Sequence, residues 1–67
     1  MDDKTLLQEA LIVHEGAVRY GGRFMRTLAV LIECADMSNL RKIYRTWPEE
    51  WARYLQMGKR HQEDANS

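Results

Sequence analysis

The sequence predicts an all-α domain, a compact bundle of three or four short helices. Apolar residues recur at helical spacing in almost every segment, three polar or glycine-containing breaks separate these segments, and no stretch alternates with the period of a strand. The chain has 67 residues, which make one domain at most. We expect a single helical domain over residues 1–58 and a disordered tail over residues 59–67, where no aliphatic residue anchors the chain.

The first predicted helix covers residues 6–20. Thr5 and Gln8 have the spacing of a capping box, and the two aspartates upstream suit the positive end of a helix dipole. Gly16 lies inside this helix and costs it about 1 kcal/mol relative to alanine. Apolar residues at helical spacing form its buried stripe: Leu6, Ala10, Val13 and Ala17.

The glycine pair at 21–22 is the strongest internal break, and two structures are compatible with it. The apolar stripes on its two sides fall on the same side at 100° per residue, as in one kinked helix of about 30 residues that would need a dimer partner. We favour a loop between two antiparallel helices. The second helix then carries a stripe of Phe24, Leu28, Leu31 and Ala35, widened by Met25, Ala29 and Ile32.

Two further helices are predicted after the second break. Asp36 or Ser38 can cap a short third helix, whose apolar residues are Leu40, Ile43 and Tyr44. Thr46 and Glu49 form another capping-box pattern around a proline that suits a first turn, and Gly58 is a natural residue to end the fourth helix. We expect the first two helices to form the main hairpin and the fourth to close it.

Size and charge limit the classes of protein to consider. Ten Lys and Arg balance ten Asp and Glu, which argues against a dedicated nucleic-acid binder, and no apolar run approaches the roughly 20 residues of a membrane span. A chain this short is marginally stable as a monomer, and its one cysteine excludes an internal disulfide, so we expect a homodimer. The free thiol fits a reducing compartment, and we expect a cytoplasmic location without membrane contact.

Five arginines are the candidate partner-binding residues: Arg19, Arg23, Arg26, Arg41 and Arg45. The first three lie opposite the apolar stripe if helical phase continues through the glycines, and guanidinium groups in a row suit phosphates or an acidic partner. The alternative is an ordinary solvated face paired with Glu15 and Glu33. The last two, with Lys42, follow a polar turn as in a helix-turn-helix, but that turn lacks the glycine that is common there.

The remaining chemical groups do not form a catalytic or metal-binding pattern. His14–Glu15 lacks the second histidine of a zinc protease, because position 18 is valine. Cys34 lies beside the apolar stripe, where a thiol behaves as a small hydrophobe. Trp47 and Trp51 share a helix face and suit either a binding anchor or, in our interpretation, the core. We expect no enzymatic activity, no cofactor and no metal.

One string of capping and packing residues between about residues 20 and 55 follows a pattern that can be written R-F…L-A…A-D-x-x-N…F/W-P-E-x-W-x-x-Y. Its members here are Arg23–Phe24, Leu28–Ala29, Ala35–Asp36, Asn39, Trp47–Pro48–Glu49, Trp51 and Tyr54. The pattern resembles a loose class of small phage and prophage proteins. This resemblance specifies an architecture and carries no functional residue over to this chain. It implies a context in which small proteins inhibit host machinery, as anti-CRISPR and other anti-defence proteins do.

Two functions therefore compete. The first is a small phage-type interaction module, a stoichiometric inhibitor that occupies the surface of a host nucleic-acid-processing or defence complex such as a CRISPR effector. The alternative is a small nucleic-acid-binding regulator that uses the arginine-rich helix faces. The balanced charge makes simple imitation of DNA a poor explanation for the first.

Overall fold

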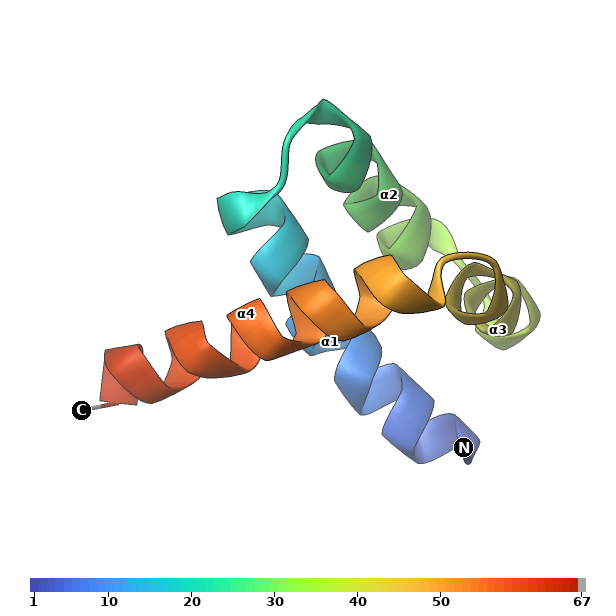
Figure 1. The fold of residues 1–67 in the computed structure, drawn as a ribbon. Helices are drawn as coiled ribbons and strands as arrows, with labels where there is room; N and C mark the ends of the chain where they lie inside the picture. Colours follow the sequence, from blue (N-terminus) through green and yellow to red (C-terminus); the bar gives the residue numbers. More distant parts are fainter. Residues whose placement is uncertain (67) are drawn as a thin grey trace.

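The computed structural model describes residues 1–66, and within them it contains four helices and no strand (Figure 1). The helices are α1 (Asp3–Tyr20), α2 (Arg23–Cys34), α3 (Met37–Thr46) and α4 (Pro48–Asn66). The predicted all-α class is thereby confirmed. The Cα radius of gyration is 11.2 Å, close to the roughly 11 Å expected for a compact chain of this length.

Two aspartates define where helices begin. Asp2 is the N-cap of α1, and its Oδ1 accepts a 2.8 Å hydrogen bond from the Thr5 backbone N–H. The predicted cap at Thr5 is therefore wrong by three residues, because an aspartate upstream offers a stronger acceptor. Asp36 caps α3 in the same way, accepting from the Asn39 N–H at 2.8 Å. Of the two caps proposed for this helix, the structure uses Asp36 and not Ser38.

The glycine pair forms a loop, as favoured from the sequence. Gly21 ends α1 and Gly22 precedes α2, and both have extended backbone angles. Figure 1 shows the chain reversing between α1 and α2 at this point. Because this loop interrupts the helix, the helical spacing of α1 does not continue into α2. Arg19 therefore does not share a helix face with the arginines of α2.

One apolar core joins the four helices. Its fully or nearly buried members are Leu6, Ala10, Val13, Ala17, Met25, Leu28, Ala29, Ile32, Leu40, Ile43, Trp51 and Tyr54. The stripe expected on α1 is confirmed. The expectation for α2 is confirmed in part: Leu28 and the three residues expected to widen the stripe, Met25, Ala29 and Ile32, are buried, whereas Phe24 and Leu31 are 57% and 50% exposed. The buried face of α2 is therefore centred on the widening residues, roughly 80° from the centre of the main predicted stripe at 100° per residue.

The most extensive contact between helices is that of α1 with α4, which cross at a close approach of two glycines. A Cβ atom on Gly16 would lie 2.5 Å from the Tyr54 carbonyl oxygen and 3.1 Å from the Gly58 nitrogen. A Cβ atom on Gly58 would collide with the carbonyl oxygen of Ile12. Gly16 therefore allows α4 to pack closely against α1, which the sequence did not indicate; the sequence indicated only its unfavourable effect on helix stability.

The predicted end of the fourth helix at Gly58 is wrong, because this glycine is buried within α4 against α1. Helix continues to Asn66 where the sequence predicts a disordered tail, and Ser67 lies outside the described residues. Figure 1 shows this last part of α4 extending beyond the crossing with α1. No helix in residues 1–66 is both long and apolar enough to cross a bilayer.

Candidate functional site

The structure separates the five candidate arginines into three places. Arg19 donates a 2.7 Å hydrogen bond from Nε to Glu15, and Arg41 donates one of 2.7 Å from Nη1 to Asp3. The other three, Arg23 and Arg26 on α2 and Arg45 on α3, are exposed and form no ion pair within residues 1–66. Two of the candidates are thus engaged inside the fold, and three are available to a partner.

The two α3 arginines lie on one flank of their helix. Arg41 and Arg45 line a hollow of about 170 Å³ together with Tyr44 and the N-terminal residues Met1 and Leu6. The other candidates lie on different helices, Arg23 and Arg26 on α2 and Arg19 on α1. The role of the five arginines in binding stays a prediction.

One cavity lies between α2 and α3 and is mostly apolar. Its volume is about 390 Å³, and its walls are Leu31, Cys34 and Ala35 from the α2 side and Asn39, Lys42, Ile43, Thr46 and Trp47 from the α3 side. Its large apolar side chains are the half-buried Trp47, the exposed Leu31 and the buried Ile43. Apolar pockets of about 300–1,000 Å³ are typical of binding sites.

An aromatic pair adjoins this cavity. The rings of Phe24 and Trp47 are 5.9 Å apart and meet edge to face at 71°. Phe24 and Leu31 are seven residues apart, so they lie on one side of α2, and both are half-exposed or more. We call the surface formed by Phe24, Leu31, Trp47 and the walls of the cavity the α2–α3 pocket.

The wall of the α2–α3 pocket carries a single charged side chain among the described residues, Lys42. The next acidic residues after Trp47 are Glu49 and Glu50 at the start of α4. Residues 23–46 carry five Lys and Arg, of which Arg41 is paired with Asp3, against two Asp and Glu. Of the two acidic residues, Asp36 caps α3 and Glu33 accepts from His14 on α1 at 3.3 Å. Both carboxylates therefore have partners inside the fold.

A second apolar cavity lies on the opposite flank of α2, between α1 and α2. It has a volume of about 320 Å³, and Leu7 and Leu11 form part of its α1 wall. His14 and Glu33 also line it, and His14 Nε2 lies 3.3 Å from Glu33 Oε2. This contact links α1 to α2, so the wall of the second cavity includes a polar contact within the fold.

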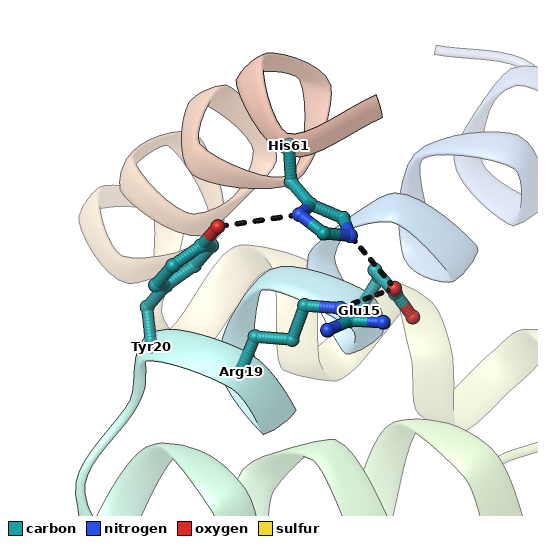
Figure 2. A network of polar contacts seen from close by, with 4 residues as sticks. All are labelled: Glu15, Arg19, Tyr20 and His61. Carbon is teal, nitrogen blue, oxygen red and sulfur yellow. Dashed lines mark hydrogen bonds and ion pairs between the residues drawn. The ribbon is translucent and has the colours of Figure 1, made fainter. Parts of the chain in front are cut away.

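A polar network ties the end of α1 to the C-terminal part of α4 (Figure 2). His61 lies between Tyr20 and Glu15: its Nδ1 is 3.3 Å from the Tyr20 hydroxyl, and its Nε2 is 3.6 Å from Glu15 Oε1. The hydrogen bond from Arg19 and the Arg19 charge lower the pKa of Glu15, and the same hydrogen bond and the Glu15 charge raise the pKa of Arg19. The network gives the part of α4 beyond Gly58 a fixed contact with α1.

The tryptophans divide between the core and the α2–α3 pocket. Trp51 is 3% exposed, stacks edge to face on Tyr44 at 5.3 Å and donates a 2.9 Å hydrogen bond from Nε1 to Glu9. The core role predicted for it is confirmed. Trp47 packs against the core with one part of its ring and forms the cavity wall with another. The exposed thiol of Cys34 also lines this cavity.

Fold and surface together define a small all-α domain with an apolar pocket beside unpaired cations. No protein-family model, curated protein or solved structure matches the chain. Within residues 1–66 there is no group of three or more His, Cys, Asp or Glu side chains placed to hold a metal ion.

Proposed function

We propose that this chain is a protein–protein interaction module that acts as a stoichiometric inhibitor of a host nucleic-acid-processing or defence complex. The observation that supports binding is the α2–α3 pocket, an apolar cavity of about 390 Å³ bordered by an exposed phenylalanine and leucine. The resemblance to small phage proteins supports the kind of target, of which a CRISPR effector is one example.

Covering this surface with another macromolecule would be favourable in free energy. Burying apolar surface contributes about 25 cal/mol per Å², so exposed Phe24 and Leu31 gain free energy when a partner covers them. Tryptophan is enriched among the residues that dominate binding energy, and Trp47 already has one side fixed against the core. A side chain held in place loses little rotamer entropy on binding.

The first test is affinity capture from a host-cell extract treated with nuclease, with mass spectrometry of what is bound. Leu31→Asp places a charge in the pocket, and Leu7→Asp is the matched control because both leucines are 50% exposed on helix surfaces. We expect wild type and Leu7→Asp to retain one complex at near-equal stoichiometry and Leu31→Asp to lose it. Equal capture by all three proteins, or none that survives nuclease treatment, would contradict the proposal.

Inhibition is tested separately on the captured complex. Its activity should fall linearly with added chain and reach its minimum at one equivalent per binding site, because a surface inhibitor is not turned over. Leu31→Asp should leave the activity unchanged at the same concentration. Loss of activity at far less than one equivalent would indicate catalytic action and would overturn the inhibitor mechanism.

Nucleic-acid binding is the second candidate function, supported by the exposed and unpaired Arg23, Arg26 and Arg45. It predicts binding to DNA or RNA that weakens steeply with salt, because each phosphate contact releases a counterion. Reversing the charge of Arg23 and Arg26 should abolish that binding while circular dichroism stays unchanged. Undetectable binding at about 50 mM salt removes this candidate.

A further inference from the structure

The α2–α3 pocket has the dimensions of a receptor for one large side chain. Its volume of about 390 Å³ lies near the lower end of the range of binding pockets, and its walls include the side chains of Leu31, Ile43 and Trp47. Centres of protein interfaces are built in this way, with a bulky apolar anchor of one partner filling a desolvated pocket of the other.

The electrostatics around the pocket specify the charge of the partner. Lys42 lies in the wall, and Arg23 begins α2 directly beside Phe24, with neither cation paired within the described residues. No carboxylate of the described residues lines the cavity, so Lys42 is unopposed within its wall. Complementary potentials of opposite sign accelerate association and exclude partners of like charge.

The shape of this site favours a protein over a nucleic acid. A phosphate backbone is bound by a row of cations along a surface, whereas this cavity has a single lysine in an otherwise uncharged wall. Its one aromatic ring, Trp47, is already packed edge to face against Phe24 and against the core. The apolar cavity instead matches an aliphatic or aromatic side chain.

We propose that the α2–α3 pocket binds an acidic segment of a partner protein, which inserts one bulky apolar side chain while its carboxylates contact Lys42 and Arg23. This proposal rests on the proposed function as an interaction module and names the chemistry of the segment that is recognised. The apolar anchor supplies affinity, and the acidic flanks supply orientation and rate of association.

A selection from a random library of displayed 12-residue peptides tests this proposal without knowledge of the natural partner. Peptides that bind wild type are counter-selected on Leu31→Asp, which isolates those that depend on the pocket. We expect the survivors to carry net negative charge and at least one Leu, Phe or Trp. Survivors that are neutral or basic, or no survivors at all, would overturn the proposal.

Two charge reversals measure the contribution of the pocket lysine. Lys42→Glu should weaken the selected acidic peptides by about tenfold, whereas Lys59→Glu, which changes net charge equally from exposed α4, should leave affinity within about twofold. Equal losses in both variants would show that only net charge matters and would contradict a site at Lys42.

Two outcomes would assign the pocket to another occupant. Displacement of bound peptides by single-stranded oligonucleotides at physiological salt would favour a nucleic acid. Concentration-dependent dimerisation in analytical ultracentrifugation, lost in Leu31→Asp, would favour a second copy of this chain. If the capture experiment fails but the peptide selection succeeds, the inhibitor function is rejected. The proposal that the pocket binds an acidic segment with an apolar anchor is then still supported.

Discussion

Replacing Gly16 with alanine tests the crossing of α1 and α4, which organises the fold. The added Cβ would lie 2.5 Å from the Tyr54 carbonyl oxygen and 3.1 Å from the Gly58 nitrogen. Both are backbone atoms of α4, so no side-chain rotation relieves the overlap. The helices must separate, and the core between them must repack.

Two opposing effects set the magnitude. Alanine is a better helix former than glycine by about 1 kcal/mol, which would stabilise α1 if Gly16 were merely tolerated. Overpacking in a close-packed interior costs about 1–3 kcal/mol, and a clash between two backbones lies at the upper end. We therefore expect Gly16→Ala to lower the free energy of unfolding by about 1–2 kcal/mol. For a domain of this size that corresponds to a fall in Tm of about 4–16 °C.

Urea unfolding followed by tryptophan fluorescence and circular dichroism measures this change, and thermal unfolding gives the Tm. Gly22→Ala is the matched control, because a Cβ there meets no atom within 4 Å and the backbone angles suit any residue. It should stay within about 0.5 kcal/mol of wild type, since its entropic gain and its poorer capping offset each other. A Gly16→Ala variant as stable as wild type, or more stable, would refute the close crossing.

Three further predictions concern single contacts. Asp36→Ala should cost about 1 kcal/mol by removing the α3 cap, whereas Ser38→Ala should be nearly neutral in the same urea assay. Trp51→Ala should cost about 3–5 kcal/mol, or prevent folding, because it empties the core and removes the bond to a glutamate; circular dichroism and urea unfolding measure this loss. The Arg19 hydrogen bond lowers the pKa of Glu15, so its contribution is present above the ordinary carboxyl pKa of about 4.3 and is lost as pH falls through the folded pKa. Wild type should therefore lose more stability than Glu15→Gln between about pH 5 and pH 3, and equal losses would contradict this contribution.

Local signals in the sequence were sufficient for the helices and most of their boundaries. The glycine pair after Tyr20, the aspartate before α3 and the proline at the start of α4 act through the backbone of their own segments, so they can be interpreted without tertiary structure. The stripe on α1 was also predictable, because its polar and apolar residues separate clearly around the helix.

The orientation of α2 was not predictable in the same way. Its apolar residues cover more than half of the helix surface, so periodicity alone cannot select the side that faces α1. Ala17 on α1 and Ala29 on α2 are fully buried, and small residues allow the two helices to approach on that side. The residues left on the outside, Phe24 and Leu31, then become part of the candidate site.

Gly58 illustrates a different limit. A glycine after an apolar run is a common helix end, and nothing local distinguishes it from one that admits a second helix. The distinction comes from the backbone at Ile12, far away in sequence. The candidate site was missed for a similar reason, since Leu31 and Trp47 become neighbours only when α3 packs against the rest of the fold.

The central claim is that the chain binds its partner through the α2–α3 pocket. The most direct measurement is the amount of partner captured from nuclease-treated extract by Leu31→Asp relative to Leu7→Asp, with circular dichroism showing both to be folded. We predict capture near the wild-type level for Leu7→Asp and at least tenfold less for Leu31→Asp, about 1.4 kcal/mol or more of binding free energy. Equal capture by the two variants, or greater loss in Leu7→Asp, would contradict the claim and direct attention to the opposite flank of α2.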